Sequence, residues 1–195
     1  DRPVTLESNV LETIKYLSNA EKPLVIAGNG ILNGESQQEF IRFIETTGIP
    51  TVFSRFAYQI LPYSHPLNFG LAGIKGTRFC PAILGSADVV LSLGCRLAPQ
   101  LAGHNFDCFN SNASVVMVDL EEAELGKPGV SIDLPIKSDV KQFLQVFLAL
   151  CDTQQMPQWS NWVQQCSELK ERLPIVSPAL ERDPIDLYHF MSRLD

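Results

Sequence analysis

Apolar residues fall in short runs along the first 150 positions, and amphipathic stretches separate these runs. The two most apolar runs lie at 89–93 and 115–118, and each ends at a glycine or an acid that opens a loop. Such runs are typical of strands buried in a parallel sheet whose carboxyl ends face a ligand crevice. We therefore expect residues 73–119 to form the centre of the fold.

The remaining pattern predicts the elements around this centre. Apolar residues at helical spacing predict helices over 4–19, 36–48, 77–85, 139–148 and 156–173. Strands are expected at 24–27, 50–54, 88–93 and 114–119, with a short one at 130–132. Ser36 and Glu39 have the spacing of a capping box, and the stretch 55–76, rich in Pro and Gly, is expected to be irregular. The alternation predicts an α/β fold, in which a parallel sheet of about five or six strands carries helices on both faces.

A cluster of prolines predicts where this domain ends. Pro174, Pro178 and Pro184 lie within eleven residues, and a new apolar pattern starts after them. We expect one domain over 1–173, a linker over 174–184, and the start of a neighbouring domain over 185–195. The chain begins at Asp1 rather than at Met, so we expect it to be a piece of a longer protein.

Charge and cysteine content exclude several function classes. The net charge is −7, the sequence pI is about 5.0, and no run of Lys or Arg occurs, which argues against nucleic acid and anionic membranes as partners. No apolar run approaches the roughly 20 residues that span a bilayer. The odd set of cysteines has no CxxC pair, so we expect reduced thiols in a cytoplasmic protein. These cysteines are Cys80, Cys95, Cys108, Cys151 and Cys166.

Gly28 and Gly30 follow the first strand, where a dinucleotide-binding fingerprint would begin. The third glycine, Gly34, comes one position too late for GxGxxG, and the strand at 50–54 ends without the acid that would bind a ribose. We therefore reject that fingerprint. The two glycines indicate either a tight turn or a close backbone approach to a phosphate or flavin.

Three further positions near strand ends could bind a ligand, and each has a structural alternative. Gly73 to Thr77 precedes a helix and can offer N–H groups to an anion with the charge of Lys75, or simply begin the helix. Arg96 can hold a phosphate or carboxylate, or pair with an acid of the protein. Asp119 can accept hydrogen bonds from a ribose, or cap the segment 121–124. His65, His104 and His189 are scattered, and no complete active site is evident.

The order of these motifs resembles the central domain of thiamine-diphosphate-dependent enzymes of the acetolactate synthase and pyruvate decarboxylase group. The matching pieces lie at 25–30, 49–54, 65–77, 87–96, 115–127 and 139–144. The resemblance covers about residues 5–150. The tail from Asp183 resembles the beginning of the C-terminal, diphosphate-binding domain of that group.

This resemblance implies a Rossmann-like sheet of six strands in the order 3-2-1-4-5-6. It implies a homo-oligomeric parent enzyme, a dimer or tetramer, that decarboxylates 2-keto acids with thiamine diphosphate and Mg²⁺. These cofactors are held by N- and C-terminal domains, so the chain alone is expected to be inert.

Members of the group hold FAD, ADP, a CoA nucleotide or nothing in the central domain. The positions that match flavin-contacting motifs are Gly28, Gly30, Gly73, Gly76, Gly94, Arg96, Asp119 and Asp139. Lys75, Ala98 and Gln100 depart from the histidine, acid and arginine found in flavin-containing acetolactate synthases. FAD or ADP is thus a possible ligand that the resemblance leaves open.

Two other functions remain as alternatives. A stand-alone NAD-dependent deacylase of the sirtuin kind shares the architecture, but it needs a catalytic His followed by Gly and a zinc module of four cysteines, and only Gly103-His104 echoes this. A purely structural spacer would use all of the glycines named above for turns and would have an empty crevice.

Overall fold

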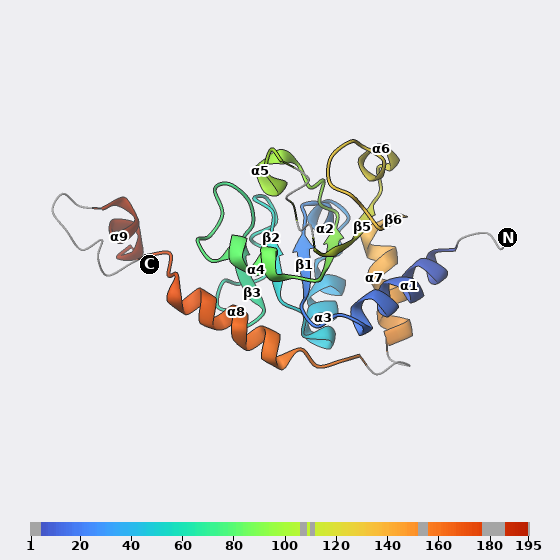
Figure 1. Cartoon of the computed structure of the whole chain (residues 1–195), viewed down its shortest axis with the longest axis horizontal. Helices are drawn as coiled ribbons and strands as arrows, with labels where there is room; N and C mark the ends of the chain where they lie inside the picture. The colour runs from blue at the N-terminus through green and yellow to red at the C-terminus, as the bar shows by residue number, and fades with distance from the viewer. Residues whose placement is uncertain (1–4, 106–108, 110–111, 152–155, 177–185, 195) are drawn as a thin grey trace.

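The structure, a computed structural model, describes residues 5–105, 109, 112–151, 156–176 and 186–194. Six parallel strands form one sheet in the order β3-β2-β1-β4-β5-β6, as the resemblance implies (Figure 1). The strands are β1 (Pro23–Ala27), β2 (Thr51–Phe53), β3 (Asn68–Leu71), β4 (Val89–Leu93), β5 (Ser114–Asp119) and β6 (Leu134–Lys137). All residues of β1 and β4 are buried, so helices and loops cover both faces of the sheet centre.

The helices connect the strands and pack around the sheet. They are α1 (Leu6–Ser18), α2 (Gly30–Asn33), α3 (Gln37–Thr47), α4 (Cys80–Ser86), α5 (Pro99–Ala102), α6 (Glu122–Leu125), α7 (Val140–Cys151), α8 (Ser160–Arg172) and α9 (Leu187–Ser192). Helices α1 and α3 both pack on α7, while α8 contacts α4 and the edge strand β3. No helix in the described part of the chain is long and apolar enough to span a membrane.

Aromatic side chains join the helices to the core. The rings of Phe43 on α3 and Phe147 on α7 meet edge to face, with centroids 4.8 Å apart. The indole N–H of Trp159 donates a 2.9 Å hydrogen bond to the carbonyl of Ala20, and that of Trp162 donates one of 2.9 Å to the carbonyl of Pro23. These contacts come from within the chain and add to its continuous buried core.

Several details differ from the predictions. Residues 68–71, expected to be irregular, form β3, and the last strand lies at 134–137 rather than at 130–132. Both are short edge strands interrupted by Gly70 or Pro135, so they lack the apolar run that marks a buried strand. Helix α8 begins at Ser160, four residues later than predicted.

The expected capping box of α3 is also absent from the structure. The Ser36 hydroxyl donates a 3.0 Å hydrogen bond to the carbonyl of Ile31 instead of accepting one from α3. A capping box forms at α1, where Thr5 and Ser8 exchange hydrogen bonds. Residues 177–184 of the proposed linker at 174–184 fall outside the described residues, and the domain boundary there remains a prediction.

Candidate functional site

The exits of β1 and β4 cross at the carboxyl edge of the sheet, backbone against backbone. The N–H groups of Gly28 and Gly30 donate to the carbonyls of Leu93 and Gly94 at 2.9 and 3.0 Å. A Cβ atom on Gly28 would lie 2.0 Å from the Gly94 oxygen, which is far inside the contact distance. Close approach of the two chains therefore requires glycine here, and these N–H groups are already bonded.

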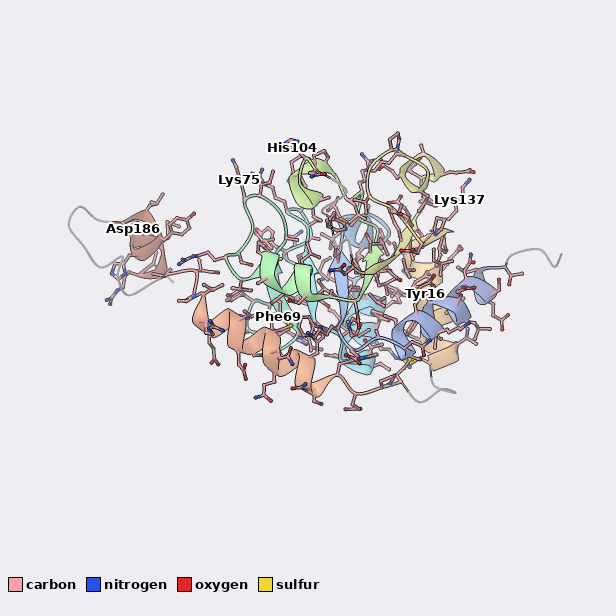
Figure 2. The ribbon with its side chains drawn as sticks, viewed as in Figure 1. Tyr16, Phe69, Lys75, His104, Lys137 and Asp186 are labelled. Atoms are coloured by element: carbon pink, nitrogen blue, oxygen red, sulfur yellow. The ribbon has the colours of Figure 1, made fainter. Side chains whose placement is uncertain are left out.

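The loop from Gly73 to Thr77 packs against α5. The Ile74 N–H donates a 2.9 Å hydrogen bond to the carbonyl of Gln100, and a Cβ on Gly73 would lie 2.3 Å from that oxygen. The N–H groups of Gly76 and Thr77 bond to carbonyls within residues 71–73. The loop backbone is thus engaged with the protein, whereas Lys75 is exposed at the carboxyl edge (Figure 2).

Arg96 lies just beyond β4, where the sequence leaves open either a phosphate or carboxylate ligand or an ion pair with an acid of the protein. Its side chain is 71% exposed, and its Nε lies 3.7 Å from a carboxylate oxygen of Glu124. Lys127 donates hydrogen bonds to the carbonyl of Arg96 and to the same Glu124 carboxylate. Glu124 therefore neutralises charge around Arg96, and the arrangement joins the end of β4 to α6.

Asp119, the last residue of β5, is a buried carboxylate at the carboxyl edge. It is only 8% exposed, and its Oδ1 accepts a 3.0 Å hydrogen bond from the Glu121 N–H. Among the residues that the structure describes, no donor bonds to its Oδ2. A buried carboxylate oxygen without a donor can accept a hydrogen bond from a ligand hydroxyl group.

Cys95 lies between the β1–β4 crossing and Asp119. Burial and, to a smaller extent, the negative charge of Asp119 raise the pKa of its thiol to about 11, although a hydrogen bond from the Leu97 backbone acts to lower it. Leu97 adopts a left-handed backbone conformation with φ of 46°. The thiol therefore stays protonated at neutral pH and does not act as a nucleophile.

Asp139 caps α7 at the carboxyl end of β6. Its Oδ1 accepts hydrogen bonds from the backbone N–H groups of Lys141 and Gln142 at 2.8 and 3.2 Å. These two bonds satisfy N–H groups at the start of the helix, as a helix cap does.

The predicted site residues thus lie along one edge of the sheet in three groups. Gly28, Gly30 and Gly94 meet at the β1–β4 crossing, and α7, with Asp139 at its start, packs on Gly94 through Val140. The loop with Gly73 and Gly76 lies against α5. Arg96 and Asp119 flank α6 on the ends of neighbouring strands. Glu124 and Lys127 belong to this third group and were not singled out from the sequence, although their spacing of three residues permits an ion pair.

The described residues contain no assembled catalytic or metal-binding group. No cluster of three or more His, Cys, Asp or Glu residues in this part of the chain can hold a metal ion. The Nδ1 of His65 accepts a hydrogen bond from the Leu67 N–H, as expected for a turn residue. The free cysteines Cys80, Cys95, Cys151 and Cys166 are buried, and Cys108 lies outside the described residues. The residues present therefore do not fit a thiamine diphosphate and Mg²⁺ site.

Two hollows lie at the opposite, amino-terminal edge of the sheet. One of about 410 Å³ lies between the end of α3 and the start of α8, beside Gly48 and Trp159. The other, of about 390 Å³, lies between α1 and the first residues of β4 and β5, Val89 and Ser114. Neither hollow reaches the residues predicted to bind a nucleotide.

The chain is similar in sequence to part of a known group of enzymes. A family model described as "thiamine pyrophosphate enzyme, central domain" matches residues 10–147. A probable acetolactate synthase large subunit of Methanocaldococcus jannaschii is 28% identical over 185 residues, which are 95% of this chain and 31% of that protein. The acetolactate synthase large subunit of Lactococcus lactis is 33% identical over 168 residues, which are 86% of this chain and 28% of that protein. The chain thus spans about three tenths of the length of the curated relatives it matches.

Proposed function

Because the chain belongs to the family of thiamine pyrophosphate enzyme central domains, we propose that it is the central domain of an acetolactate synthase-like enzyme that decarboxylates 2-keto acids. In this proposal thiamine diphosphate and Mg²⁺ are held by N- and C-terminal domains of the whole protein, which is a homo-oligomer. Thiamine diphosphate supplies the carbanion chemistry when it is bound.

A non-catalytic role is supported by one observation: the described part of this six-stranded domain contains no assembled catalytic or metal-binding group. All six strands are present, yet no group of metal ligands occurs among the described residues. Cys95, the thiol nearest the predicted site, is buried with a raised pKa. We infer that the domain contributes structure and ligand accommodation, while the reaction occurs elsewhere in the protein.

Asp119 supports a role in holding an adenine nucleotide such as ADP or FAD. No described residue donates to its Oδ2, so this oxygen can accept a ribose hydroxyl, and Arg96 beyond the neighbouring strand can pair with a phosphate if Glu124 moves away. The backbone N–H groups of Gly28 and Gly30 are not available for this purpose, because they bond to β4 and its exit.

A structural spacer is the second candidate, and the glycine geometry favours it. Gly28, Gly30 and Gly73 each pack too closely against other backbone atoms to admit a Cβ, so turn and packing roles alone explain them. In that case the carboxyl edge would hold no nucleotide.

Thermal unfolding of the purified chain with FAD, ADP, NAD and CoA separates the two candidates. A ligand that binds only the folded state raises the free energy of unfolding by about 2.7 kcal/mol at 100 times its Kd. The melting temperature Tm therefore rises. We expect a shift with ADP or FAD. No shift with any of the four would favour the spacer.

The whole protein tests the enzymatic proposal separately. With thiamine diphosphate and Mg²⁺ it is expected to release CO₂ from one or more of a panel of 2-keto acids, while the 195-residue chain alone releases none. Failure of the whole protein on every 2-keto acid would contradict the proposed activity without affecting the nucleotide result.

A further inference from the structure

Helix α8 is attached to the rest of the domain by side chains along its length. At its start, the indole N–H groups of Trp159 and Trp162 donate hydrogen bonds to backbone carbonyls, and in its middle Cys166 is fully buried. Near its end, Lys170 reaches the edge strand β3, beside which α8 lies in Figure 1. Its neighbour Leu169 is only partly buried. A charged side chain thus helps to hold the end of α8, whereas buried side chains hold its start.

The ammonium group of Lys170 lies among electron-rich groups. Its Nζ donates hydrogen bonds of 3.0 and 3.3 Å to the carbonyls of Asn68 and Tyr63. The same atom lies 4.2 Å from the centre of the Tyr63 ring and 5.8 Å from that of Phe69, which lies beside α8 in Figure 2. The three N–H groups of an ammonium can serve both carbonyls and a ring face at once. Lys170 therefore ties α8 to Asn68, the first residue of β3, and to the loop before it.

No carboxylate in the described part of the chain balances this charge. The ion pairs found there do not include Lys170, and residues 46–87, which supply its contacts, contain no Asp or Glu. Partial burial lowers the pKa of Lys170 below its usual value, because water is removed and no anion takes its place. The side chain is still partly exposed. A larger fraction of this amine than of an ordinary surface lysine is therefore unprotonated and within reach of a reagent.

Acyl transfer to this amine would remove what its contacts require. The neutral amine keeps two N–H groups, one for each carbonyl, and has a lone pair that can attack the acyl carbon of an acyl thioester or acyl phosphate. A C–N bond forms, the bond from the acyl carbon to the thiolate or phosphate breaks, and a proton passes to water. The product amide is uncharged and has one N–H group, so it can serve only one carbonyl and is not attracted to the Tyr63 ring as a cation is.

We propose that Lys170 is an acylation site, and that its acylation releases the end of α8 from β3 and from the loop that contains Tyr63. Trp159, Trp162 and Cys166 keep the start and middle of the helix in place, because their contacts do not involve this charge. Release is therefore local, and the centre of the sheet stays folded. The contact lies at the amino-terminal end of β3 and involves neither the cofactors nor the nucleotide of the proposed function.

An acetyl group placed on Lys170 tests the release. The 195-residue chain is made with Nε-acetyllysine at position 170, and hydrogen exchange is followed by mass spectrometry. Amide exchange in peptides from 166–173 and 61–71 should become about tenfold faster, while exchange in β4 and β5 stays unchanged. Acetyllysine at position 15 is the matched control, since Lys15 is exposed on α1 and its ammonium has no hydrogen bond or ion pair with the described residues. Unchanged exchange at 166–173, or equally faster exchange in β4 and β5, would overturn the proposed release.

Two substitutions measure the role of the charge without an acetyl group. Lys170→Gln removes the charge and should reproduce the faster exchange at 166–173 and 61–71. Lys170→Arg keeps a cation near the Tyr63 ring and should stay closer to the unmodified chain. Equal exchange in the two variants would show that the charge does not hold the helix.

Reactivity is tested on the unmodified chain. Acetyl phosphate and acetyl-CoA are added in separate reactions at neutral pH, and peptide mass spectrometry follows the acetylated fraction of each lysine. Lys170 should be acetylated ahead of the exposed Lys15 and Lys75 by at least one of the two reagents, which identifies the class of donor. Slower acetylation of Lys170 than of both exposed lysines with both reagents would overturn its assignment as an acylation site.

Discussion

The β1–β4 crossing and the ends of β4 and β5 are neighbours on one edge of the sheet, yet they are built differently. At the crossing, main chains touch directly, and Gly28 would place a Cβ 2.0 Å from the Gly94 oxygen. At the ends of β4 and β5, side chains meet instead, with Asp119 buried and Arg96 exposed beside Glu124.

This difference separates two meanings of a glycine-rich strand end. At the crossing, glycine permits packing, and the N–H groups that could bind a phosphate are bonded within the protein. Beyond β5, no donor in the described part of the chain bonds to the Oδ2 of Asp119. We therefore propose that nucleotide binding depends on side chains of the second region rather than on glycines of the first.

The largest effect is expected when one methyl group is added at the β1–β4 crossing. Gly28→Ala places a Cβ against backbone atoms that cannot rotate away, so we expect a loss of about 3–5 kcal/mol in the free energy of unfolding. Urea denaturation measures it. Gly85→Ala on α4 is the control, because no atom lies within 4 Å of its Cβ and helix propensity favours alanine by up to about 1 kcal/mol. Equal stability of the two variants would show that the crossing is open in solution.

The next effect concerns ligand binding at the second region. Asp119→Asn removes the negative charge while keeping an oxygen for the Glu121 N–H, so ADP affinity should fall by about 1–3 kcal/mol. Isothermal titration calorimetry measures the change. Asp88→Asn is the control, since it removes the same charge at the opposite edge of the sheet, where Asp88 accepts hydrogen bonds from the Glu21 and Lys22 N–H groups. If both variants lose affinity equally, Asp119 has no specific role in the site.

The sequence predicts the centre of this sheet better than its edges. Strands β1, β4 and β5 are buried on both faces, which produces the apolar runs by which they are recognised. The edge strands β3 and β6 need fewer apolar residues and tolerate Gly70 and Pro135, so their patterns resemble loops. The strand order itself came from the resemblance to a known family, and the structure confirms it.

For the candidate site, the sequence indicates strand-end positions but not what lies opposite them. Asp119 and Arg96 could be placed near each other because they follow strands that are adjacent in the sheet. The contact of Gly28 with Gly94 joins residues far apart in the chain and has no local pattern. Glu124 likewise becomes the partner of Arg96 only once the loop after β4 meets α6.

A smaller effect is expected from Cys95, a buried residue that lies between the two regions. Because burial raises the pKa of this thiol from 9.0 to about 11, its ionisation favours the unfolded chain. Its contribution to stability is complete below pH 9 and is lost between about pH 9 and pH 11, reaching a loss of about 1.4 kcal/mol at pH 10. Urea denaturation across this range measures it. Cys95→Ala should reduce the decline, and an unchanged pH profile would show that the thiol is solvated.

The smallest effect is expected for the ion pair at the second region. Arg96 is 71% exposed and its Nε lies 3.7 Å from Glu124, so water screens most of the attraction. A double-mutant cycle of Arg96→Ala and Glu124→Gln in urea should give a coupling free energy below about 0.5 kcal/mol, falling with added salt. The interaction of Lys127 with both residues supplies a structural link that Arg96→Ala leaves in place. A coupling above about 1 kcal/mol would show that Glu124 holds Arg96 firmly, and a phosphate would then have to compete with the carboxylate for the guanidinium.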